Sequence, residues 1–329
     1  MSASQDVLLD VKDLKVHFSI PSGILFGKPK LLKAVDGVSF QVRAGETLGI
    51  VGESGCGKST LGRAVLRLLE PTAGQVAWFG QEMGDMKSGE LRNVRSDLQV
   101  IFQDPLASLD PRMTIGQIIS EPLVTHYPKL SKNEVKEKVK AMMKKVGLLP
   151  DQINRYPHEF SGGQCQRIGI ARAMILEPKL IVCDEAVSAL DVSIQAQIVN
   201  LLMGLQKEFG LSLIFISHNL SVVRHISQRI MVLYLGRMME VADRDQIYSN
   251  PFHPYTKALI SAVPIPDPNV ERNKEHVALK GDLPSPLNPP SGCVFRTRCP
   301  FAKNICASEV PELKVYDGKR EAACHFIEE

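Results

Sequence analysis

A glycine-rich stretch at residues 52–60, GESGCGKST, constrains the fold more tightly than any other part of the chain. An apolar run at 47–51 precedes it, and a segment with apolar residues at helical spacing follows at 61–69. This order predicts a strand, a phosphate-binding loop and a helix, in which backbone N–H groups and the positive end of the helix face a phosphate. A glycine-rich turn that matched by chance would not explain both flanks.

Residues of this loop have separate expected tasks on a nucleotide. Lys58 is expected to bridge the β- and γ-phosphates, Ser59 to place its hydroxyl on Mg²⁺, and Thr60 to bind a neighbouring phosphate. The remaining loop residues are expected to surround the phosphates: Gly52, Glu53, Ser54, Gly55, Cys56 and Gly57.

Strand and helix patterns alternate in the second half of the chain. Apolar runs at 180–185, 211–218 and 229–236 indicate strands, and helical patterns lie between them at 193–210 and 219–227. This alternation predicts an α/β fold with a parallel core sheet covered by helices.

Two other regions have different patterns. The beginning of the chain is β-rich and predicts an antiparallel β subdomain, with two short strands around turns at 33–46. From about residue 104 to 178, apolar residues recur three and four residues apart, which predicts a helical subdomain. The chain then ends in a Pro-rich linker and a small module rich in Pro and Cys.

Polar residues gather at the predicted carboxyl ends of three strands. Asp184 and Glu185 end one apolar run, Gln103 ends the run LQVIFQ, and His218 ends LSLIFISH. Ligands of open α/β sheets bind at these ends. Asp184 is therefore expected to hold Mg²⁺ through water, and Glu185 to orient the attacking water. His218 would contact the γ-phosphate and Gln103 would reach Mg²⁺ and water, although single residues of this kind are often only structural.

A second phosphate-binding pattern, SGGQCQR, lies at 161–167, about a hundred residues after the first. Ser161 is expected to cap the following helix, and Gly162 and Gly163 to leave its first N–H groups uncovered. Because the helical subdomain separates it from the first loop, this pattern is expected to meet a nucleotide held by another chain. The alternative is a capped helix without a ligand.

Composition excludes several classes of protein. The net charge of +3 is too small to indicate a nucleic-acid-binding surface. The chain has no apolar run of about 18 residues, the length that crosses a membrane. Its beginning, MSASQDVLLD, lacks the basic region of a secretory signal, so a cytoplasmic location is expected.

Together, GESGCGKST, Gln103, SGGQCQR, LIVCDE, SALD at 188–191 and His218 resemble the motif set of an ABC transporter ATPase, a P-loop NTPase. The resemblance covers about residues 7–262, and it implies an ATPase domain over 1–265 and a C-terminal extension over 266–329. It also implies a head-to-tail dimer that binds ATP and Mg²⁺. In that dimer Phe18 would stack on adenine, Ser161, Gly162, Gly163 and Gln164 would contact the partner's ATP, and Asp191 would cross the dimer seam.

The end of the chain resembles the C-terminal extension of ATPase subunits from oligopeptide, dipeptide and nickel importers. For this chain the resemblance implies an ATP-hydrolysing subunit that powers oligopeptide import, with dipeptide or nickel import as the alternative. Its partners would be a second, non-identical ATPase subunit, two permease subunits and a periplasmic peptide-binding protein. The subunit would lie on the cytoplasmic side of the inner membrane.

Two further functions agree less well with these motifs. A soluble ABC-type ATPase acting on nucleic acid or ribosomes usually has two ATPase halves and extra basic segments, and neither is present. A small-molecule kinase would have no use for SGGQ and SALD.

Four of the seven cysteines crowd into the last forty residues: Cys293, Cys299, Cys306 and Cys324. The spacing C-x₅-C-x₆-C-x₁₇-C lacks the close CxxC pair of small zinc ribbons. Four thiolates could hold a [4Fe–4S] cluster, which some importer ATPases of this kind carry. Zinc, and free or partly oxidised thiols, stay open as alternatives.

Overall fold

The computed structural model describes residues 7–21, 29–264, 269, 272–273, 279 and 281–327. The chain divides into two compact units. The first contains Val42–Thr47 and Trp78–Ser217, and the second contains Leu9–Gln41, Leu48–Ala77 and the residues from His218 onward.

The first unit is built on three parallel strands. β7 (Leu180–Asp184) lies between β6 (Leu98–Ile101) and β8 (Ser212–Ile216). Every residue of β7 and β8 is buried, which explains why both strands are continuous apolar runs and do not alternate. The prediction of a parallel core sheet is confirmed for these strands.

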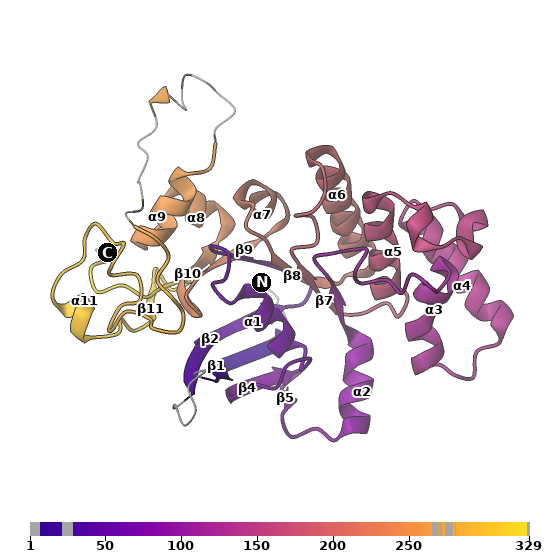
Figure 1. The fold of residues 1–329 in the computed structure, drawn as a ribbon, viewed down its shortest axis with the longest axis horizontal. Helices are drawn as coiled ribbons and strands as arrows, with labels where there is room; N and C mark the ends of the chain where they lie inside the picture. The colour runs from indigo at the N-terminus through magenta and orange to yellow at the C-terminus, as the bar shows by residue number, and fades with distance from the viewer. Residues whose placement is uncertain are drawn as a thin grey trace. The chain divides into compact units, whose positions relative to one another are not determined.

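Three helices of the first unit form the predicted helical subdomain. They are α3 (Ile115–His126), α4 (Lys132–Lys145) and α5 (Gly162–Met174), which Figure 1 shows side by side in magenta. Each begins with a capping box, in which a hydroxyl and a side chain three residues later each bind a backbone N–H group. The remaining elements of this unit are β5 (Gln81–Glu82), α2 (Ser88–Asp97), η1 (Pro150–Asn154), η2 (Pro157–Glu159) and α6 (Val192–Phe209).

The second unit contains the strand that precedes the phosphate loop. β3 (Thr47–Val51) pairs in parallel with β9 (Arg229–Tyr234), and β9 pairs antiparallel with β10 (Arg237–Asp243). The other elements are β1 (Val7–Ile20), β2 (Lys30–Arg43), α1 (Lys58–Val65), β4 (Ala73–Trp78), α7 (Leu220–Ile226), α8 (Arg244–Ser249), α9 (Pro254–Ser261), α11 (Ile305–Ser308), β11 (Lys314–Tyr316) and β12 (Arg320–Ala322).

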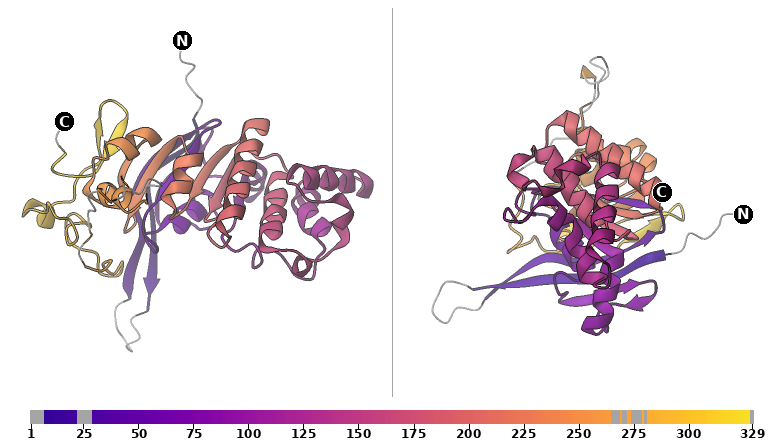
Figure 2. Two further views of the ribbon diagram at one scale, coloured as in Figure 1. Left: turned by 90° about the horizontal axis from the view of Figure 1, so that it is seen from above. Right: turned by 90° about the vertical axis from the view of Figure 1, so that its right-hand side faces the viewer.

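The interpretation of 33–46 as two short strands was wrong. The structure has one strand, β2, which lies beside β1 as a long indigo ribbon in Figure 2. Asp36-Gly37 suggested a turn, but the chain passes through it with Gly37 at a φ of 86° and continues as a strand.

The cysteine-rich end of the chain packs into the second unit. β12 pairs antiparallel with β10, so that Ala322 lies opposite Glu240, and β11 pairs with β12. Phe295 is also fully buried, and its ring contacts those of Tyr234 and Tyr255. The boundary between 265 and 266 stays a prediction.

Candidate nucleotide-binding site

The predicted phosphate loop joins β3 to α1, as the sequence indicated. Helix α1 begins at Lys58, and Gly57 precedes it at a φ of 104°. A side chain at Gly57 would place its Cβ 2.0 Å from the carbonyl oxygen of Ala34. Only glycine fits there, so the loop is closed tightly at the point where the helix starts.

Lys58 is held inside this loop. Its side chain is buried, with 4% of the residue exposed, and its ammonium donates to the carbonyl oxygens of Gly52 at 2.9 Å and Glu53 at 3.0 Å. A buried ammonium held by neutral carbonyls is partly desolvated, so an incoming phosphate would gain a strong charge-assisted hydrogen bond. The loop therefore fits a polyphosphate.

The loop also contains a buried thiol. Cys56 is 1% exposed, and burial raises the pKa of its thiol above the ordinary value. Cys56 is therefore a neutral packing residue of the loop, and only its backbone is available to a phosphate.

Two predicted site residues of the first unit, Gln103 and Glu185, are in contact. Gln103, two residues after β6, donates from Nε2 to Oε2 of Glu185 at 3.0 Å. Glu185 follows β7 directly and has a φ of 48°, a left-handed conformation that is uncommon outside glycine. Its N–H donates to the carbonyl oxygen of Ile216 at 3.0 Å. Glu185 thus lies in a strained turn whose backbone is hydrogen-bonded to the neighbouring strand β8.

Asp184 is the last residue of β7, and only 3% of it is exposed. A buried carboxylate at a strand end requires charged or hydrogen-bonding neighbours. Asp184 and Glu185 therefore differ in setting, since one is enclosed by the sheet and the other lies at its edge.

Ser161 is the N-cap of α5, as predicted. Its N–H donates to Gln164 Oε1 at 3.0 Å, and Ser161 Oγ accepts from the N–H of Gln164 at 3.4 Å. Gly162 is exposed, and a side chain there would meet only Leu190 Cδ2, at an ordinary 3.7 Å. None of the residues that the structure describes therefore requires glycine at Gly162.

The remaining predicted residues lie at the ends of elements. Asp191 is the exposed N-cap of α6, Phe18 lies near the end of β1 with 36% exposed, and His218 is exposed two residues after β8. Asn219 caps α7 by accepting the N–H groups of Ser221 and Val222.

Two residues that sequence reasoning did not single out contact the loop at Glu53. Tyr255 Oη accepts the Glu53 N–H at 3.0 Å, and Arg298 donates to the Glu53 carboxylate at 2.7 Å. They are 202 and 245 residues away in sequence, so no local pattern could have revealed them.

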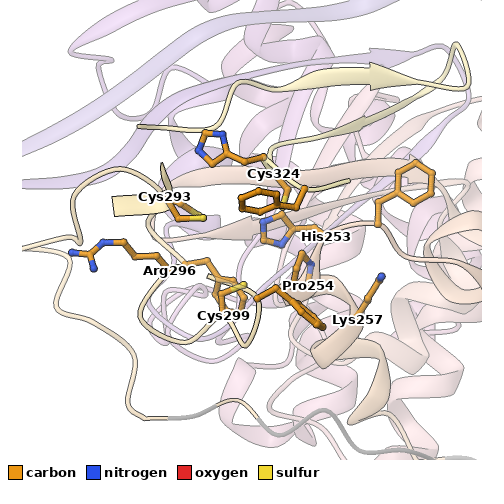
Figure 3. Close-up of a pocket in the computed structure, with 13 residues that line it drawn as sticks. His253, Pro254, Lys257, Cys293, Arg296, Cys299 and Cys324 are labelled. Atoms are coloured by element: carbon orange, nitrogen blue, oxygen red, sulfur yellow. The ribbon is translucent and has the colours of Figure 1, made fainter. Parts of the chain in front are cut away.

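The four C-terminal cysteines line one cavity of about 160 Å³. Figure 3 shows Cys293, Cys299 and Cys324 around it, together with His253, Arg296 and Lys257. Burial raises the pKa of Cys293 to about 11, and it also raises the pKa values of Cys299 and Cys324. Within the described residues, no three Cys, His, Asp or Glu side chains are arranged to hold a single metal ion. The described residues therefore support neither the iron–sulfur cluster expected from the sequence nor its zinc alternative.

Comparison with known families places both parts of the chain. Residues 35–188 match the model of the ABC transporter family, and residues 239–306 match that of the oligopeptide/dipeptide transporter C-terminal region. The chain is 66% identical over 310 residues to the oligopeptide transport ATP-binding protein OppF of Salmonella typhimurium, covering 94% of this chain and 93% of that protein. This chain belongs to the ABC transporter family, among its oligopeptide transport ATP-binding proteins.

Other relatives agree with this placement. The ABC ATPase described here is 65% identical to OppF of Escherichia coli over 316 residues, which cover 95% of each chain. A solved structure of the ATP-binding cassette MJ0796, a dimer in a post-hydrolysis state bound to ADP and Pi, aligns with a TM-score of 0.65 and 28% identity. That alignment covers 72% of this chain and 99% of the cassette. The chain is thus an ATP-hydrolysing subunit of a transporter, and the P-loop NTPase fold is confirmed. Among the helices of the described residues, none is long and apolar enough to cross a bilayer.

Proposed function

We propose that this ABC ATPase powers the import of oligopeptides. The observation that carries the proposal is the match to OppF proteins over nearly the whole chain, including the C-terminal region. Its partners are a second, non-identical ATPase subunit, two permease subunits and a periplasmic peptide-binding protein. The chain acts on the cytoplasmic side of the inner membrane, and the ATPase domain spans 1–265 and the extension 266–329.

The proposed roles at the nucleotide follow from the chemistry of each side chain. The loop from Gly52 to Thr60 binds the phosphates, and the buried Lys58 exchanges its carbonyl partners for phosphate oxygens. Ser59, Gln103 and Asp184 would hold Mg²⁺, which would neutralise developing charge on the phosphates. Phe18 contacts the adenine.

We infer that hydrolysis depends on three residues. Glu185 polarises the attacking water. Gln103 is hydrogen-bonded to Glu185 and keeps its carboxylate oriented, and this hydrogen bond breaks when the water enters. His218 donates to the γ-phosphate. These roles position groups and stabilise charge, as in other phosphoryl transfers, and need no covalent intermediate.

The second phosphate-binding pattern is proposed to serve the partner's ATP. Ser161 and Gly162 are exposed at the start of α5, and the positive end of a helix suits an anion. Asp191, the exposed N-cap of α6, is proposed to lie at the seam of the head-to-tail dimer.

Purification of the assembled transporter tests this function. A tagged chain, extracted from membranes in mild detergent, should bring with it a second ATPase and two permease subunits. In liposomes with the binding protein enclosed, oligopeptides should stimulate ATP hydrolysis and a labelled oligopeptide should cross the membrane. Stimulation by dipeptides or Ni²⁺ alone would support the alternative importers, and co-purification with RNA or ribosomes would contradict the proposal.

The four cysteines are proposed to hold a [4Fe–4S] cluster. The support is a donor set of four thiols around one cavity. Such a cluster would cross-link the C-terminal segments. Because burial raises the thiol pKa values of Cys293, Cys299 and Cys324, these three would lose protons when a cluster is assembled.

Anaerobic purification decides between the alternatives. A cluster would give a brown protein with about four iron and four sulfide per chain, and Cys299→Ser should lower both. A colourless protein free of iron would exclude the cluster, and zinc in place of iron would identify the single-ion site instead.

A further inference from the structure

The phosphate loop of this chain carries an acidic residue, Glu53, at its second position. ATP is a polyanion, so an uncompensated carboxylate in the loop would oppose its binding. The structure shows what compensates it. Arg298 Nη1 lies 2.7 Å from Glu53 Oε2, and the two side chains are only 9% and 27% exposed. Solvent therefore screens this pair less than it would a surface pair.

Glu53 is also the point at which the loop is fastened. Its N–H donates to the hydroxyl of Tyr255 at 3.0 Å, and its carbonyl oxygen accepts from the ammonium of Lys58 at 3.0 Å. A shift of Glu53 would therefore move a carbonyl that holds the phosphate-binding lysine.

Arg298 itself is held by the cysteine-rich segment. It lies directly before Cys299, and its backbone N–H donates to the carbonyl oxygen of Phe295 at 3.0 Å. Phe295 is 1% exposed and packs on Tyr255, so the segment that carries the guanidinium is anchored in the core. The hydrogen bond to Glu53 raises the pKa of Arg298, which keeps it charged at any physiological pH.

We propose that Arg298 is a positioning residue for ATP, supplied to the phosphate loop by the C-terminal extension. It neutralises Glu53 and fixes the backbone that holds Lys58. The proposal rests on the proposed role of Gly52–Thr60 as the phosphate-binding loop. It gives the extension a direct part in nucleotide binding, whether or not its cysteines hold a cluster.

Three variants of the chain test the proposal, and the quantity measured is their affinity for Mg-ATP by calorimetry. Arg298→Gln should weaken binding about 10-fold, the order expected for one uncompensated charge roughly 10 Å from another at an effective dielectric constant of about 20. Glu53→Gln alone leaves the positive charge of Arg298 uncompensated, so it should raise the affinity by a factor of the same order. The double variant Arg298→Gln/Glu53→Gln should return to near the wild-type affinity.

The matched control is Arg296→Gln. Arg296 belongs to the same segment, but its guanidinium donates to Ser291 and not to the loop, so ATP affinity should not change. A wild-type affinity of Arg298→Gln would overturn the proposal. A double variant as weak as Arg298→Gln would also overturn it, because Arg298 would then serve only the fold, which thermal unfolding of each variant reports separately.

A separate control tests whether the loop Gly52–Thr60 binds ATP. Lys58→Ala should abolish detectable binding of Mg-ATP. If Lys58→Ala binds normally, the assignment of the loop fails, and this result is distinct from the failure of Arg298 to matter.

Discussion

Replacing Glu185 with glutamine should lower ATP hydrolysis at this chain's site about 10²–10³-fold, the usual cost of removing one preorganised catalytic group, while ATP binding is retained. Glutamine has the same shape and keeps the hydrogen-bonding reach toward Gln103, so the local structure should survive. What it loses is the negative charge that polarises water. The measurement is phosphate release by the assembled transporter, with the partner ATPase carrying alanine in place of its own phosphate-loop lysine, so that only this site turns over.

Glu208→Gln is the control for this prediction. Glu208 is an exposed acid of the same unit that pairs with Lys145, and its loss should not change the rate. Near-normal turnover of Glu185→Gln would remove the carboxylate from the mechanism, and a loss of ATP affinity would show that it serves binding.

Gly162→Ala is expected to lower ATP hydrolysis at the partner's site while this chain's own ATP binding stays unchanged. An added methyl group at Gly162 has room in the chain, so the stability of the chain and its own ATP affinity should stay unchanged. Hydrolysis by the partner's site should nevertheless fall about 10–10²-fold, because even a 1 Å displacement of a bound nucleotide costs this much. The assay pairs Gly162→Ala with Lys58→Ala in this chain, so that only the partner's nucleotide site is active, and compares it with Lys58→Ala alone.

Gly169→Ala in the same helix is the matched control. A side chain at Gly169 would meet nothing within 4 Å, and the residue lies further along α5. It should leave hydrolysis intact. If Gly162→Ala is equally harmless, the exposed start of α5 does not meet a nucleotide, and the shared site is wrong.

Local sequence patterns predicted most of the helices and strands because residues that favour their starts and ends are recognisable in the sequence. Gly210 ends α6 in the left-handed conformation that glycine favours, and Ser161 starts α5 with a capping box. The exception at Gly37 shows the limit of this method. A glycine tolerates a positive φ both in a turn and inside a strand, and only the neighbouring strand decides between them.

The candidate site could be predicted only where its residues lie beside a predicted strand or helix. The places of the loop, Gln103, Asp184 and Glu185 could be predicted because each lies next to a recognisable strand or helix, whereas their roles stay predictions. Tyr255 and Arg298 could not, because their contacts with Glu53 depend on how distant segments pack. The acid in the loop was itself the only signal, since a carboxylate beside a phosphate site calls for a counter-charge.

The pairing of Glu53 with Arg298 has a consequence for biosynthesis. A ribosome makes the loop early, yet the arginine follows 245 residues later. A nascent chain that contains the loop and the strands and helices up to α9 therefore still lacks the guanidinium, and contacts of such long sequence separation form late in folding. The newly made subunit should thus acquire its full affinity for ATP only once its last segment has been released from the exit tunnel, which would keep incomplete chains from trapping nucleotide.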